Sequence, residues 1–182
     1  MKLSSSLATV LVLTCAALAN AQTPEMPKPG AEHQKLAYFI GTWQIEGEIK
    51  PGPYGPGGKM SGTEHVEWMP GGFFTISHSD SKSAMGDSKG LAIMGYKNED
   101  KAYTFNEFNS TGETVEARGT TDGTTWTWTT VNMMMGPTKM KGRYTVKIAS
   151  PTAYSFKLEA GPETGDWMTI MEGKASKTST AK

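Results

Sequence analysis

From residue 42 to the end of the chain, apolar side chains recur at almost every second position. In one such segment Tyr144 and Val146 alternate with Thr145 and Lys147. A period of two is typical of a β-strand with one buried and one solvated face. Turn residues separate ten segments of this kind, which predicts ten strands. They lie at residues 42–50, 61–69, 72–80, 90–97, 102–109, 113–121, 124–132, 138–148, 152–159 and 167–176.

The order of these segments predicts the architecture. They follow one another without crossover helices, which favours an antiparallel meander, and a long meander protects its edges best by closing. We therefore expect an all-β fold in one domain, residues 31–176: a single antiparallel up-and-down barrel of about ten strands. A two-sheet sandwich is the alternative that the pattern leaves open.

Connection lengths predict which end of the barrel is open. Successive connections of a meander alternate between its two ends. The longer ones, at residues 51–58, 81–90, 109–111, 132–137 and 161–165, fall on one rim. Binding groups concentrate on loops held by a rigid scaffold, so we place the mouth there. A short helix at 31–40 enters the first strand from the other rim, where it and Trp43 close the floor.

One hairpin gives a specific register. Asp122-Gly123 suits a two-residue type I′ turn. That turn would pair Gly119 with Trp126 and Ala117 with Trp128, so that both indoles lie opposite small residues. The same alternation turns both indoles toward the buried face and the intervening threonines toward water.

The N-terminus has the features of an export signal. Residues 1–21 contain one lysine near the start, an apolar run and Ala-Asn-Ala, the small-residue pattern of a cleavage site. A run of about a dozen apolar residues is too short to span a hydrocarbon core, which needs about 20. We expect a protein exported to the periplasm or beyond, with no integral membrane segment after cleavage. Residues 22–30 are expected to form a flexible lead-in and 177–182 a disordered tail.

Composition narrows the chemistry of the mature chain. Its single cysteine, Cys15, lies within the predicted signal, so disulfides, thiolate metal sites and a cysteine nucleophile are unavailable. Loss of Lys2 leaves 17 basic against 18 acidic residues, without a basic stripe. This balance argues against nucleic acid as a partner.

Two histidines are the candidate metal ligands. His65 and His78 lie on neighbouring predicted strands around Met-Pro-Gly-Gly. A two-residue Gly71-Gly72 loop would set the imidazoles directly opposite each other, whereas a type II turn at Pro70-Gly71 would set them diagonally. Two histidines with a carboxylate can hold zinc or iron. The alternative is a pair of polar side chains hydrogen-bonded to water and neighbours, and two histidines without a third ligand favour it.

Carboxylates and methionines offer further candidates. A solvated face explains the glutamates better than a catalytic dyad does, and no hydrolase or phosphate-binding motif is present, which favours a protein that is not an enzyme. These glutamates are Glu46, Glu48, Glu64, Glu67, Glu107 and Glu116. The methionines around Met133–Met135 could bind Cu(I), but a deformable apolar entrance is the simpler interpretation.

A set of motifs resembles known families. Gly41-Thr42-Trp43 after a short helix resembles the Gly-x-Trp start of calycin barrels, namely lipocalins, fatty-acid-binding proteins and nitrobindins, and ten strands fit the latter two better. The stretches HQKLAYFIGTW, GTEHVEWMPGGFF, KGLAIMGY and MEGKA resemble the exported bacterial family called domain of unknown function 1579. That resemblance implies the fold and export. Nitrobindin-like relatives hold haem through a histidine in the C-terminal strands, where this chain has none.

Together these observations predict an exported barrel that holds a small apolar or amphipathic molecule in its lumen or mouth. Two alternatives remain: a metal- or haem-binding barrel using His65 and His78, and a structural or partner-binding barrel with a filled interior. No cofactor is expected under the first interpretation. The predicted ligand-binding residues are Met94, Trp126, Trp128, Met133, Met135, Tyr144 and Phe156.

Overall fold

The computed structural model describes residues 26–52, 55–131, 133–135, 138–162 and 164–179, without the side chains of residues 133–135, 138 and 179. The predicted signal, residues 1–21, and the first part of the lead-in lie outside the described residues. Residues 26–30 form neither helix nor strand. No helix in the described part of the chain is long and apolar enough to cross a membrane.

One short helical segment precedes the strands. An α-helix, α1 (Ala31–Lys35), continues as a 3₁₀ turn, η1 (Leu36–Phe39), as the sequence predicts for 31–40. The strands are β1 (Gly41–Ile49), β2 (Gly58–Trp68), β3 (Phe74–Ser83), β4 (Gly86–Lys97), β5 (Ala102–Asn109), β6 (Thr114–Thr121), β7 (Thr125–Thr130), β8 (Met133–Met135), β9 (Thr138–Ser150), β10 (Ala153–Gly161) and β11 (Met168–Ser179).

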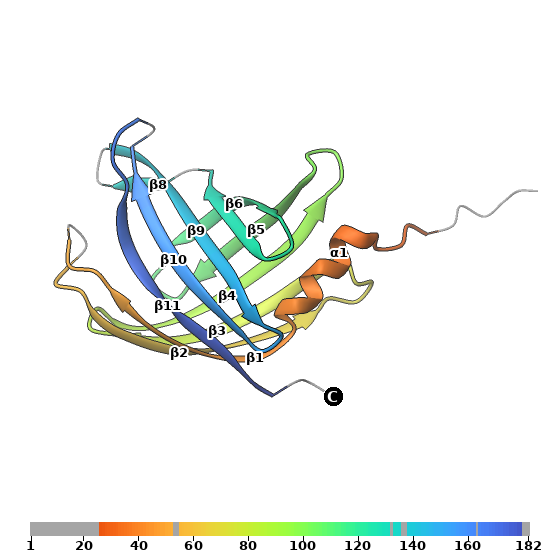
Figure 1. Cartoon of the computed structure of the whole chain (residues 1–182), viewed down its shortest axis with the longest axis horizontal. Coiled ribbons are helices and arrows are strands. Elements are labelled where there is room, and N and C mark those ends of the chain that lie inside the picture. The colour runs from red at the N-terminus through yellow and green to blue at the C-terminus, as the bar shows by residue number, and fades with distance from the viewer. Residues whose placement is uncertain (1–25, 53–54, 132, 136–137, 163, 180–182) are drawn as a thin grey trace, which may run out of the picture.

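Ten of these strands close into one antiparallel barrel. β1 pairs with β2 on one side and with β11 on the other, and β9 pairs with both β7 and β10. The circle of neighbours is therefore complete, which confirms the barrel and rules out the sandwich. Figure 1 shows α1 at one end of the barrel and β8 toward the other.

Part of the loop predicted at residues 132–137 is a strand, β8. Met133–Met135 form a short strand that pairs only with the start of β9, with Met133 opposite Met140. The alternation that defines a strand cannot be recognised in three identical residues, so no local pattern predicts this strand. β8 thus extends the β9 edge at the mouth.

The connection between β3 and β4 is also shorter than predicted. The polar residues assigned to a loop at 81–90 continue both strands, and Ser83 pairs with Gly86 across a two-residue turn. Serine and lysine on both faces hide the period of two, although the backbone ladder persists. β11 also extends beyond its predicted end, into the predicted tail, because Thr42 and Trp43 of β1 pair with Ser179 and Lys177. Lys177 Nζ donates to the Tyr38 carbonyl at 3.0 Å and lies over the Trp43 ring.

The hairpin at Asp122 differs in register by two residues from the prediction. Gly119 lies opposite Trp128, and Thr121 lies opposite Trp126. The cause is the Asp122 side chain: its Oδ1 accepts hydrogen bonds from the backbone N–H groups of Thr124 (2.8 Å) and Thr125 (2.7 Å), which centres the turn on Gly123 and Thr124. A shift of two residues leaves each side chain on the same face of the sheet, so both indoles still point inward.

Aromatic residues fill the floor of the barrel. The floor cluster consists of Leu36, Phe39, Trp43, Tyr103, Trp126 and Tyr154, all buried. Trp43 is 0% exposed, and its Nε1 donates to the Phe39 carbonyl at 2.7 Å. Tyr103 donates its hydroxyl to the Glu32 carboxylate at 2.7 Å, and the Tyr38 hydroxyl lies 3.0 Å from the carbonyl oxygens of Ser150 and Ala153. The helical segment therefore closes the floor, as predicted.

Candidate functional site

The inner surface above the floor cluster, which we call the lumen, has two chemically different walls. Inward positions of β9, β10 and β1 carry Tyr144, Phe156, Leu158 and Ile45. Inward positions of β2–β5 carry instead the residues that we call the carboxyl wall. These are Glu64, Ser77, Ser79, Gly90 and Glu107.

Strand register brings the carboxyl wall together. Glu64 lies opposite Ser79, which lies opposite Gly90, and one row below, Ser77 connects through Ala92 to Glu107. Because side chains on one face recur at every second residue, all of these positions point into the barrel. Four neighbouring strands thus place two carboxyl groups on one inner wall.

Glu64 is the more enclosed of the two carboxyls. Its Oε1 accepts a hydrogen bond from the hydroxyl of Ser77. Burial raises the pKa of Glu64 above its ordinary value, and the Ser77 hydrogen bond offsets part of that rise. The side chain nevertheless stays only half-buried, so it borders space inside the barrel that a water molecule can reach. Enclosure in low dielectric with some free surface is typical of a binding cavity.

Glu107 approaches from the far edge of the same wall. Burial raises its pKa, and the charges of Glu64 and Glu113 raise it further. A glycine makes room for it: a Cβ at Gly90 would lie 3.3 Å from Glu107 Oε1 and 2.5 Å from Ser79 Oγ. The described chain supplies no hydrogen bond to this carboxyl, so its acceptors point to water or to a ligand.

Tyr144 lies across the lumen from the carboxyls. Its ring centroid is 5.8 Å from that of Phe156. Burial raises the pKa of its hydroxyl, and the charges of Glu64 and Glu107 raise it further, which places all three groups in one electrostatic environment. The hydroxyl has no hydrogen-bond partner among the described residues. The lumen thus offers an aromatic face opposite two acids.

The predicted ligand-binding residues fall into four groups. Tyr144 lines the lumen. Trp126 and Trp128 are 2% and 5% exposed and are packed against Phe39, Tyr103 and Phe105, while Met94 is also buried. Phe156 lies over two glycines, because a Cβ at Gly173 would meet its Cζ at 2.5 Å. Met133 and Met135 belong to β8 at the mouth, and their side chains are outside the description.

For Glu64 and Glu107 the predicted solvated face is wrong, because both point into the barrel. Glu46, Glu48, Glu67 and Glu116 are exposed as predicted. The signal that separates the two groups is the period of two: Glu64 stands two residues before Val66, and Glu107 two residues after Phe105. Both therefore share the face of buried apolar residues. Composition alone gives no such distinction.

The two histidines lie outside the barrel. His65 and His78 oppose each other directly, which confirms the closer of the two predicted arrangements, although the turn places Pro70-Gly71 at its centre. They border a groove with Asp80 and Lys89, in which Asp80 is paired with Lys89 at 2.6 Å. No group of three or more potential metal ligands occurs within the described residues.

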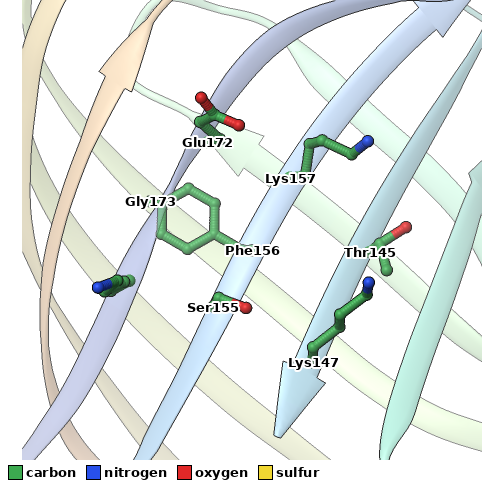
Figure 2. Close-up of a pocket in the computed structure, with 8 residues that line it drawn as sticks. Thr145, Lys147, Ser155, Phe156, Lys157, Glu172 and Gly173 are labelled. Atoms are coloured by element: carbon green, nitrogen blue, oxygen red, sulfur yellow. The ribbon is translucent and has the colours of Figure 1, made fainter. Parts of the chain in front are cut away.

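A second groove, of about 340 Å³, also opens on the outer surface. Figure 2 shows Lys147, Lys157 and Glu172 around it, on β9, β10 and β11. Glu172 is already paired with Lys50 at 2.7 Å. The inner wall therefore carries the more distinctive chemistry.

Comparisons with known proteins agree with this architecture. The crystal structure of Rv2717c from M. tuberculosis has 11% identity and a TM-score of 0.57, covering 82% of this chain and 99% of that one. The structure of EF1p2_mFAP2b bound to DFHBI has 11% identity and a TM-score of 0.42, covering 80% and 98%. The first likeness concerns the fold alone. No curated protein matches the chain. A family model described as protein of unknown function (DUF1579) matches residues 28–177.

Proposed function

The chain belongs to the DUF1579 family of proteins of unknown function, and from its lumen we propose that it binds a small amphipathic organic molecule inside the barrel. The observation that carries the proposal is the pairing of two inward carboxyls with a facing aromatic wall above a closed floor. Closed sheets of this size can enclose one small ligand. Export by the N-terminal segment is part of the same proposal and rests on the sequence of residues 1–21.

The half-buried residues of the lumen support binding rather than a wholly filled interior. Inward positions above the floor cluster keep accessible surface, in contrast to the floor itself. They include Ile45, Glu64, Phe105, Glu107, Tyr144, Leu158 and Met171. A barrel stabilised only by its own side chains gains nothing from carboxyls at such positions, because burying a charge without a partner is costly.

The first test is native mass spectrometry of the protein purified from its own host. We expect a bound organic mass that is lost on unfolding. A variant with Leu158→Trp should lose it, because Leu158 points into the lumen opposite Tyr144 and Met171. Thr129→Trp is the matched control, since Thr129 is exposed on the outward face of β7. Equal occupancy of both variants, or no organic mass in the parent, contradicts the proposal.

A further inference from the structure

The charge of the lumen narrows the class of ligand. No basic side chain among the described residues contributes to the pKa of Glu64 or of Glu107. The histidines and lysines of β2–β5 occupy outward positions, as does Arg118 of β6, and Lys177 lies in the floor against Trp43. Glu107 therefore meets the negative charges of Glu64 and Glu113, and neither carboxyl has a counterion from the described chain. Such an environment favours a positive charge and disfavours an anion.

One buried polar group on the inner face lacks a partner in the described chain. Thr75 is on the inner face of β3, the next inward position below Ser77. It is 0% exposed, and its hydroxyl has no hydrogen-bond partner among the described residues. Buried hydroxyls almost always have a partner, from the protein, from water or from a ligand. A ligand or water molecule that reaches below Ser77 would supply the missing partner of Thr75.

The opposite wall suits the remainder of a cationic ligand. Phe156 and Tyr144 occupy inward positions with their ring centroids 5.8 Å apart, and Phe105 lies two residues before Glu107 on the inner face of β5. Aromatic faces attract ammonium groups and also pack against aliphatic or aryl carbon. Carboxylates on one side and rings on the other match a molecule with a charged and an apolar end.

Resting on the proposed function, we infer that the ligand is an organic cation, a protonated amine or quaternary ammonium compound, held between Glu64 and Glu107 with its apolar part against Tyr144 and Phe156. Its positive charge stabilises the ionised form of both glutamates. Binding therefore releases protons wherever the free lumen still holds them. Affinity rises with pH through the range in which these carboxyls ionise, above the ordinary glutamate pKa of about 4.3. Three groups face these carboxyls: the Ser77 hydroxyl, which donates to Glu64, the Glu113 carboxylate, whose charge raises the pKa of Glu107, and the Tyr144 hydroxyl.

Three probes of nearly equal shape test the charge preference. They are 2-phenylethylammonium, 2-phenylethanol and 3-phenylpropanoate, titrated into the purified protein by calorimetry at pH 7.5 and at pH 5. We expect the ammonium probe to bind at least about tenfold more tightly than the other two at pH 7.5, because hydrogen bonds to a charged partner are the stronger kind. The preference should shrink at pH 5. Proton release should be visible as a dependence of the binding heat on the buffer.

Variants test whether the carboxyl wall causes the tighter binding of the ammonium probe. Glu64→Gln and Glu107→Gln should each reduce the preference, and the double variant should abolish it. Glu67→Gln is the matched control, because Glu67 is exposed on the same strand as Glu64. Since the substituted amides remove a buried charge, circular dichroism should show folded variants.

The outcomes separate this inference from the proposed function. Equal affinity for ammonium and alcohol probes, or retention of the preference in the double Gln variant, overturns the cationic assignment while lumen binding stands. Tighter binding of the carboxylate probe overturns it in the same way. Absence of binding by all three probes, together with no co-purified organic mass, overturns both.

Discussion

The floor and the lumen are lined by the same strands but are filled in different ways. In the floor, Trp43 and Trp126 are almost fully buried, and each meets other rings within about 5 Å. On the neighbouring strands, Glu64 lies opposite Trp43 and Tyr144 lies opposite Trp128, and both are half-buried and keep polar groups without complete partners. The floor therefore provides stability, whereas the lumen gives up stability for recognition, as binding sites commonly do.

The largest effect should come from the centre of the floor cluster. Trp43→Ala removes a fully buried indole and its hydrogen bond to the Phe39 carbonyl, and should cost about 3–5 kcal/mol of unfolding free energy. Urea denaturation followed by circular dichroism measures it. Trp167→Ala is the control, because this half-buried side chain contacts Arg143 outside the barrel and should cost about 1 kcal/mol. Equal losses in the two variants would mean that the floor is not where stability resides.

A methyl group added beneath an indole should have the next largest effect. A Cβ at Gly119 would lie 2.4 Å from Trp128 Cε3, so Gly119→Ala must displace the ring and should cost about 1–3 kcal/mol. Gly52→Ala should change stability by less than about 0.5 kcal/mol, because a Cβ there meets nothing within 4 Å. The two melting curves, recorded side by side, provide the comparison. A tolerated Gly119→Ala would contradict the observed register of β6 and β7.

In the lumen, removing a charged side chain should raise the free energy of unfolding rather than lower it. Burial raises the pKa of Glu64 and of Glu107, so the folded state binds protons more tightly than the unfolded state, and stability falls as pH rises from about 4.3 through the raised values. Glu64→Gln should therefore stabilise the ligand-free protein at pH 7.5 by about 1 kcal/mol. It should also flatten the fall in melting temperature between pH 4.5 and pH 7.5, by differential scanning calorimetry. Glu67→Gln should leave that profile unchanged, and a destabilised Glu64→Gln variant would show that the carboxyl is not costly.

The smallest effect is expected on the outer surface. His65 and His78 are exposed, and the neighbouring Asp80 is already paired with Lys89. A double variant, His65→Ala with His78→Ala, should change stability by less than about 0.5 kcal/mol and leave the metal content, measured by inductively coupled plasma mass spectrometry, unchanged. A stoichiometric zinc or iron that disappears in the double variant would instead support the metal-binding alternative.

Much of the fold could be predicted because the period of two is a local property. The strand predicted at 102–109 matches β5 to the residue, and the floor helix and inward indoles were found from alternation and small-residue motifs. The predictions failed where local patterns compete or vanish. At Asp122 a side-chain hydrogen bond outweighed the turn propensity of Asp-Gly, and at 81–90 a run of polar residues hid a regular ladder.

The candidate site was predicted only in part for a different reason. Alternation identified Tyr144 and Phe156 as inward residues, because they are apolar on an apolar face. The same rule contains the information that Glu64 and Glu107 point inward, but charged residues are usually solvated, and that general preference outweighed the register. Whether a carboxyl faces water or another carboxyl depends on which strands are neighbours.

What the sequence alone determined about this protein is the ten strands of the barrel, the inward face of its apolar side chains and the closed floor, since each depends on residues close together in the chain. Tertiary structure decided which strands meet, and hence that Glu64 on β2 and Glu107 on β5 share one wall opposite Tyr144 on β9. The physical reason is that pairing between strands fixes distances across the barrel, and electrostatic interactions depend on those distances rather than on separation along the chain.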